Sequence, residues 1–95
     1  MPEVEVNGQE FSYNEDRTGS RKLQISANGV PNSQHLYKFR PDPHKQKDYN
    51  KNQAAFYRDM ARHAAGLFTN GSGGPKWKET GEFNWHGVEY SLEAY

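Results

Sequence analysis

The sequence contains no cysteine, and this absence excludes a disulfide framework, a thiolate metal site and a cysteine nucleophile. It also has no net charge, because twelve Lys and Arg residues balance twelve Asp and Glu residues, which argues against a polycation that coats nucleic acid or anionic membrane. No segment approaches the roughly 20 consecutive apolar residues that a membrane-spanning helix needs. The acidic start, residues 1–6, does not resemble a secretory signal. We expect a soluble, cytoplasmic protein.

Aliphatic residues are scarce. Leu, Ile, Val and Phe together account for 14 of 95 residues, a share that lies below the level of roughly 20% under which disorder becomes common. The high net charge that accompanies disorder is absent, however, and thirteen aromatic residues are present. Each buried ring removes about 150–250 Å² from water, so rings can replace aliphatic side chains. We therefore expect one folded domain over residues 1–95, with a thin aromatic core and a small stability margin.

Two segments of alternating polarity predict β-hairpins. Asn7-Gly8 lies at the centre of residues 4–13, and Asn-Gly is typical of a type I′ turn, in which both turn residues have positive φ. His86-Gly87 occupies the same place within residues 83–92. Alternation puts one set of apolar side chains on a single face of each hairpin: Val4, Val6, Phe11 and Tyr13 in the first, and Phe83, Trp85, Val88, Tyr90 and Leu92 in the second.

Two further strands are predicted between the hairpins. Residues 22–27 alternate in polarity, and residues 36–40 form a second short alternating segment. Pro41 stops this second strand because proline cannot donate to a β-ladder. The alternation separates two pairs of side chains, with Tyr37 and Phe39 on one face and Lys38 and Arg40 on the other.

A single amphipathic helix is predicted over residues 48–68. Asn50 and Gln53 have the spacing of a capping box, and Asp48 is the other candidate cap. The apolar stripe follows helical spacing and comprises Tyr49, Phe56, Met60, Ala64 and Leu67, whereas Lys51, Arg58 and Arg62 lie on the other side.

These elements predict an α+β fold in which an antiparallel β-sheet, in β-β-β-β-α-β-β order, packs on one amphipathic helix. We expect Trp85 to be buried against Phe56 and Met60 of that helix. Residues 69–75 are rich in Gly and Ser and are interpreted as a flexible linker. They do not form a phosphate-binding loop, because they follow a helix and lack the terminal Gly-Lys-Ser/Thr.

The four histidines show no metal-site spacing, so no metal ligand is predicted. Asp42, His44 and Asp48 lie close together beside Lys45 and Lys47, and such a histidine could act as a general acid or base on a phosphodiester. A polar loop that leads into a helix accounts for the same residues. A small His-dependent nuclease is therefore the second alternative only.

Charge is segregated along the chain although its total is zero. Residues 1–20 carry −4, residues 21–68 carry +6 and residues 69–95 carry −2. Basic side chains interleaved with rings are typical of single-stranded nucleic acid binding, and a nucleic-acid-binding domain is the first alternative. The basic middle segment comprises Arg21, Lys22, Lys38, Arg40, Lys45, Lys47, Lys51, Arg58 and Arg62, with Tyr37, Phe39 and Tyr49 between them.

We favour a small non-enzymatic binding module that acts on a macromolecular partner, in the first place another protein. Small proteins of this kind are often inhibitors from phages or mobile elements, or accessory subunits. No catalytic residue, metal or cofactor is predicted. Arg58 and Arg62 are favoured as contacts because they lie one helical turn apart and a guanidinium binds carboxylate or phosphate in bidentate fashion. The predicted binding residues are Arg58, Arg62, Lys51, Lys38 and Arg40.

Overall fold

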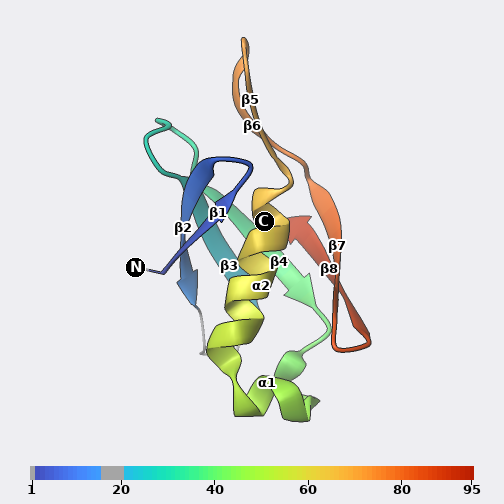
Figure 1. Ribbon diagram of the computed structural model, residues 1–95. Helices are drawn as coiled ribbons and strands as arrows, with labels where there is room; N and C mark the ends of the chain where they lie inside the picture. The colour runs from blue at the N-terminus through green and yellow to red at the C-terminus, as the bar shows by residue number, and fades with distance from the viewer. Residues whose placement is uncertain (1, 16–20) are drawn as a thin grey trace.

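A curled antiparallel sheet of six strands forms one layer of the structure (Figure 1). The computed structural model describes residues 2–15 and 21–95. The strands lie in the order β1-β2-β3-β4-β8-β7, so the sheet joins an N-terminal meander to a C-terminal hairpin. The mixed α+β class is confirmed. The strand bounds are β1 (Glu3–Val6), β2 (Gln9–Glu15), β3 (Lys22–Ala27), β4 (His35–Arg40), β7 (Thr80–Trp85) and β8 (Val88–Ala94).

Both predicted hairpin turns are present. Asn7 and Gly8 have φ of 53° and 81°, and His86 and Gly87 have φ of 51° and 83°, as a type I′ turn requires. The register that follows pairs Val4 with Phe11 in the first hairpin, and Phe83 with Tyr90 in the second. The predicted apolar sets therefore face the same side of the sheet.

The single predicted helix is wrong, because the chain forms two helices that meet at Asn52. A 3₁₀ turn, η1 (Pro43–Lys45), precedes α1 (Lys47–Lys51), and α2 (Gln53–Ala65) follows. The backbone of Asn52 has φ −151° and ψ 81°, and its side chain accepts a hydrogen bond from the Ala55 N–H at 3.1 Å. Asn52 thus starts a new helix. None of the helices in the described residues is long and apolar enough to cross a membrane.

The details of the predicted helix change accordingly. Asn50 and Asp48 lie within α1. The predicted capping box therefore does not form, and neither residue caps a helix. Gly66 follows the last residue of α2, so Leu67 lies outside the helix, although it packs against the core. Tyr49 and Phe56 are both fully buried. The apolar stripe therefore continues across the break at Asn52 and faces the core in both helices.

The core lies between α2 and the curled sheet, and it is dominated by rings. Helix α2 contacts β1, β2, β3 and β7, so the sheet curls until both of its edges reach the helix. The Phe56 ring meets Trp85 edge-to-face at 5.0 Å and Tyr90 at 5.2 Å. Trp85 is 5% exposed and Met60 belongs to the same cluster, which confirms the predicted burial of Trp85.

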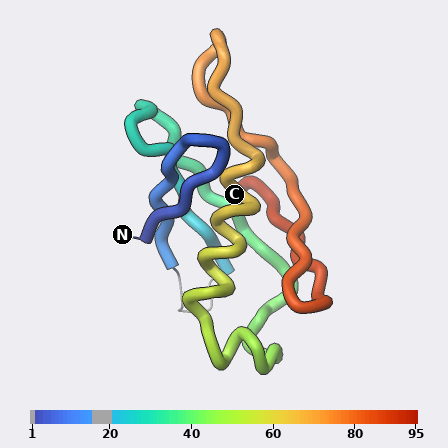
Figure 2. The backbone as a smooth tube through the Cα atoms, in the orientation of Figure 1, coloured from blue at the N-terminus to red at the C-terminus, as the bar shows by residue number. Residues whose placement is uncertain are grey.

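The predicted linker at residues 69–75 is also wrong, because this segment forms a β-hairpin. Strands β5 (Phe68–Gly71) and β6 (Gly74–Trp77) pair with each other and project beyond the rest of the molecule (Figure 2). The reason lies at the base of the hairpin, where the Phe68 and Trp77 rings lie 4.8 Å apart. Both rings pack on Phe11, at 5.5 Å and 6.0 Å, so a tertiary contact orders a Gly-rich sequence.

Candidate functional site

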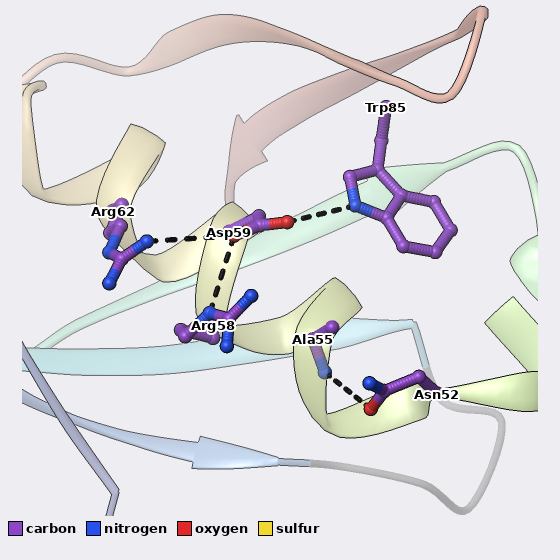
Figure 3. Close-up of polar contacts among 6 residues, drawn as sticks. All are labelled: Asn52, Ala55, Arg58, Asp59, Arg62 and Trp85. Atoms are coloured by element: carbon purple, nitrogen blue, oxygen red, sulfur yellow. Dashed lines mark hydrogen bonds and ion pairs between the residues drawn. The ribbon is translucent and has the colours of Figure 1, made fainter. Parts of the chain in front are cut away.

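The basic pair on α2 shares one carboxylate. Asp59 Oδ1 lies 3.4 Å from Arg58 Nε and 3.9 Å from Arg62 Nη1, as Figure 3 shows. Its other oxygen, Oδ2, accepts a hydrogen bond from the Trp85 indole N–H at 3.0 Å. Both arginine side chains remain at least half exposed. The pair can contact a partner, but Asp59 offsets part of its positive charge.

Lys51 does not extend this pair along the same helix. It is the last residue of α1, and the break at Asn52 separates it from Arg58 and Arg62. Its side chain is exposed. The three helical cations of the predicted site therefore belong to two different helices.

Lys38 and Arg40 lie on the face of the sheet opposite α2. The residues that alternate with them, Tyr37 and Phe39, are buried, and Phe39 lies 5.7 Å from the ring of Phe56 on α2. Arg40 forms an exposed ion pair of 3.4 Å with Glu93 of β8. The predicted binding residues are thus divided between two faces of the molecule.

The face that carries Lys38 and Arg40, here called the open face, is organised in cross-strand rows. One row runs from Asn14 through Gln24 to Leu36, and the Tyr95 N–H extends it by donating to the Leu36 carbonyl at 2.9 Å. The next row comprises Lys22, Lys38, Glu93 and Thr80. Polar and charged side chains therefore surround Leu36 and Tyr95.

Tyr95 is the most exposed large hydrophobic residue on the described surface, at 69%. The Lys22 ammonium lies 4.0 Å from the centroid of its ring, a cation–π contact across β4. A hydrogen bond with Lys22 and the charges of Lys22 and Lys38 lower the pKa of the Tyr95 phenol. The Lys22 side chain is therefore directed toward this ring.

A hollow of about 390 Å³ opens on the same face beside Lys22 and Leu36, and its other lining residues are Asn14, Glu15 and Gln24. The Asn14 amide donates to the Gln24 side-chain oxygen at 3.3 Å on one wall. The hollow thus combines one aliphatic surface with charged and amide groups.

Acidic side chains occupy the two outer edges of the same sheet. Glu5 and Glu10 lie opposite each other on β1 and β2, and both are exposed. Glu82 and Glu89 lie on the β7–β8 hairpin at the other edge and are exposed as well. The open face therefore has a basic centre between acidic edges.

Two histidine–aspartate pairs lie near α1. Asp42 Oδ1 accepts hydrogen bonds from the backbone N–H of His44, at 3.0 Å, and from the His44 ring nitrogen Nδ1. These bonds lower the pKa of Asp42. Asp48 Oδ2 lies 3.1 Å from Nδ1 of His86, so this pair links α1 to the β7–β8 turn. All four side chains are roughly half exposed.

Two buried tyrosines lie behind the first pair. The ring of Tyr49 meets the His44 ring at 5.2 Å. The hydroxyls of Tyr49 and Tyr90 are buried and have no hydrogen-bond partner within the described structure. Burial, and then the nearby charge of Asp42, raise the pKa of Tyr90. The phenols are covered, so they cannot contact a substrate directly.

Within residues 2–15 and 21–95, no group of three or more His, Asp and Glu side chains has a geometry that could hold a metal ion. Comparison with known proteins gives no matching family model, no similar curated protein and no similar solved structure. The function must therefore be argued from the surface chemistry of this chain.

Sequence reasoning missed Leu36 and Tyr95 as candidate contacts. The alternation that places Lys38 away from Phe39 places Leu36 on the same side as Lys38, so a signal for Leu36 was present. No comparable signal existed for Tyr95, because its position depends on the pairing of β8 with β4.

Proposed function

We propose that the protein is a non-enzymatic binding module whose open face contacts another protein. The observation that supports this proposal is Tyr95, an exposed ring beside the half-buried Leu36 and surrounded by charged side chains. Protein interfaces are typically centred on aromatic anchors within a polar rim. No metal or cofactor is part of the proposal.

The chemistry of the open face favours a protein partner with an acidic surface around an apolar side chain. Lys22 and Lys38 would face the partner's carboxylates, and the apolar side chain would enter the hollow beside Leu36. A nucleic acid is disfavoured because the glutamates at both sheet edges, including Glu10 and Glu89, would face its phosphates. A module that covers a partner surface in this way would act as an inhibitor, such as those of phages and mobile elements, or as an accessory subunit.

Arg58, Arg62 and Lys51 form the competing surface. A guanidinium pair suits carboxylate or phosphate groups, but Asp59 already occupies part of its hydrogen-bonding capacity. We therefore assign the main contact to the open face. Of the binding residues predicted from the sequence, Lys38 and Arg40 lie on this face.

Affinity measurements on matched variants test this assignment. The partner is captured from a host lysate with the immobilised protein, identified and purified, and its binding to each variant is measured at low and high salt. We expect Tyr95→Ala to weaken binding by at least 2 kcal/mol, about thirtyfold. Lys38→Ala/Arg40→Ala should also weaken it, whereas Arg58→Ala/Arg62→Ala should not.

The opposite pattern would move the contact to α2, and no loss from either pair would remove the basic middle segment from the binding surface. Binding to nucleic acid with a steep salt dependence that either pair reduces would favour the nucleic-acid alternative.

A His-dependent nuclease is a second candidate because Asp42 orients the His44 ring through a hydrogen bond. The pair lies on the exposed surface, and the hollow described above is formed by other residues. Incubation with RNA and with DNA, with and without EDTA, tests this candidate. Cleavage that His44→Ala abolishes would support it, and intact polymer under every condition would eliminate it.

A further inference from the structure

The β5–β6 hairpin, residues 68–77 and here called the arm, extends beyond the rest of the molecule (Figures 1 and 2). Its base is held firmly. The Trp77 indole N–H donates to the Ser33 carbonyl at 2.9 Å, and its ring stacks on His35 at 5.5 Å with an interplanar angle of 6°. The Tyr37 hydroxyl donates to the Lys78 carbonyl at 2.6 Å, which fixes the chain as it leaves the arm. The arm therefore has a defined direction from its base.

The outer half of the arm contributes little to the core. Thr69, Asn70 and Ser72 are exposed, and the residues that join the arm to the core are Phe68 and Trp77 at its base. Substitutions at the tip would therefore remove no core contact. The tip residues remain available to contact another molecule.

The arm and its base carry charge of one sign. Residues 67–78 contain two lysines, Lys76 and Lys78, and no Asp or Glu, although the chain as a whole is neutral. Both lysines are exposed. The first acid after the arm is Glu79, whose carbonyl accepts from the Ala94 N–H at 2.7 Å and which therefore lies beside β8. The arm is thus a positively charged projection, and the first acidic residue that follows it lies beside the sheet.

Two glycines in the arm are not required by the fold. Gly71 and Gly73 do not have a left-handed φ, and a Cβ added to either would meet no atom within 4 Å. Gly74 differs, because its φ of 96° favours glycine. A glycine in a strand marks a bulge, a tight bend, or a site where a ligand or another backbone approaches closely. Gly71 is the last residue of β5 and Gly73 lies in the turn that follows, so both occupy the bend of the hairpin, and the open space beside them leaves the backbone of the tip accessible to a ligand.

The side chains at the tip are unsuited to a protein interface. Residues 69–76 include no aromatic residue, Met or Arg, which are the residue types that dominate protein–protein contacts. They are small and polar, with one lysine. Interfaces with DNA are more polar and more positively charged than interfaces with protein. A nucleic acid therefore matches the arm better than a protein does.

We propose that the arm inserts into the major groove of duplex DNA. That groove, about 12 Å wide and 8.5 Å deep, admits a two-stranded β-ribbon. The three residues per strand beyond Phe68 and Trp77, at about 3.3 Å each, give the free part of the arm roughly 10 Å, which is enough to reach the floor of the groove. Lys76 and Lys78 contact phosphates, and Asn70 and Ser72 present amide and hydroxyl groups to the groove, whereas the Thr69 hydroxyl donates to the Lys76 carbonyl at 3.2 Å within the arm. The major groove of duplex RNA is too narrow for the arm.

This inference does not rest on the open-face contact, because the two surfaces use different residues. Binding is measured by fluorescence anisotropy with a labelled short duplex DNA, its single strand and the matching duplex RNA, over a series of salt concentrations. We expect weak binding to duplex DNA, with a slope of log affinity against log salt of about −1.8 for two phosphate contacts. Duplex RNA and the single strand should bind less tightly than duplex DNA.

Variants then locate the contact. Lys76→Gln/Lys78→Gln should abolish the salt dependence, whereas the matched double variant Lys45→Gln/Lys47→Gln, near α1, should retain it. Gly73→Phe should weaken DNA binding by widening the tip, and its thermal unfolding should match that of the wild type because the site is open.

Four outcomes would overturn the proposal. They are no binding to duplex DNA at the lowest salt, equal binding to all three polymers, equal effects of the two lysine variants, and unchanged DNA binding by Gly73→Phe. If Gly73→Phe instead weakened binding of the protein partner alone, the arm would be a protein contact. Loss of partner binding in Tyr95→Ala with unchanged DNA binding would keep the two sites distinct.

Discussion

The indole N–H of Trp85 donates to Asp59 across the gap between β7 and α2, at 3.0 Å. This bond joins an edge strand of the sheet to the centre of the helix that the sheet surrounds. The same carboxylate faces Arg58 and Arg62 with its other oxygen. One side chain, Asp59, therefore couples closure of the core to the placement of two surface cations.

Replacement of Trp85 by Ala should destabilise the protein by about 3–5 kcal/mol, because it removes a large ring that packs on Phe56. A small domain has on the order of 5 kcal/mol of stability in total, so this variant should be close to unfolded. Chemical denaturation followed by circular dichroism measures the loss. Trp85→Phe retains most of the packing and removes the hydrogen bond, so its loss should be smaller, about 1 kcal/mol from the bond itself. An unfolding midpoint for Trp85→Ala equal to that of the wild type would contradict the described core.

Asn52→Ala should lower the free energy of unfolding by about 0.5–2 kcal/mol, because it removes the side-chain oxygen that accepts from the Ala55 N–H. Asn50→Ala is the matched control, since Asn50 is the cap that the sequence pattern indicated. Its exposed amide donates to the His44 carbonyl at 3.0 Å and caps neither helix, so its loss should be smaller. A larger loss for Asn50→Ala would place the helix start where the sequence predicted it.

Acid should destabilise the fold partly through His63. Burial lowers the pKa of His63 below its usual 6.5, and its Nε2 atom has no hydrogen-bond partner within the described structure. Because the folded pKa is lower than the unfolded one, the unfolded state binds the proton more tightly. The stability contribution is therefore complete above pH 6.5 and declines as the pH falls toward the folded pKa.

The variant His63→Phe removes this titration and keeps a ring beside Phe83. Free energies of unfolding measured over a pH series should fall less steeply with acid in the variant than in the wild type. Part of the dependence should remain, because burial also lowers the pKa of His35. Identical pH profiles would show that His63 is protonated equally in both states.

Gly81→Ala should destabilise the protein by about 1 kcal/mol, the lower end of the overpacking range, because the atoms it would crowd are the terminal methyls of the half-buried Leu67. A Cβ at this position would lie 2.6 Å from Cδ1 of Leu67 and 3.3 Å from its Cδ2. Gly71→Ala is the control, because its site is open, and it should change stability by no more than about 0.5 kcal/mol. In a Leu67→Ala background the added cost of Gly81→Ala should disappear, and persistence of the cost there would assign it to the backbone.

Local sequence patterns were sufficient for the parts of the fold that depend on neighbouring residues. Asn7-Gly8 and His86-Gly87 determine their turns, and alternation determines which side chains face α2. The break at Asn52 was hidden, because Tyr49 and Phe56 stay on the same apolar stripe on both sides of it. Helical periodicity indicates which face of a helix a residue occupies. It does not reveal a break in the helix when the apolar residues continue on the same face beyond it.

The remaining features depend on contacts between distant segments. The arm is ordered because Phe68 and Trp77 pack on Phe11, which is more than fifty residues away in sequence. Tyr95 lies beside Leu36 through the pairing of β8 with β4. From composition alone, a linker was predicted where the arm forms. The charge pattern indicated lysines and arginines, but it did not reveal that the Tyr95 ring lies beside Lys22.

The pairing of β4 with β8 also determines the order in which the sheet can be assembled. Strands β1, β2 and β3 each pair with the next strand along the chain, whereas β4 pairs with β8 only after residues 41–87 have returned to the sheet. Closing so long a loop costs conformational entropy before its contacts are gained, so non-local pairings of this kind slow folding. The row from Leu36 to Tyr95 crosses this pairing and exists only after the loop has closed. A partner that binds the open face would therefore recognise chains that have completed folding and would not bind a partly folded meander.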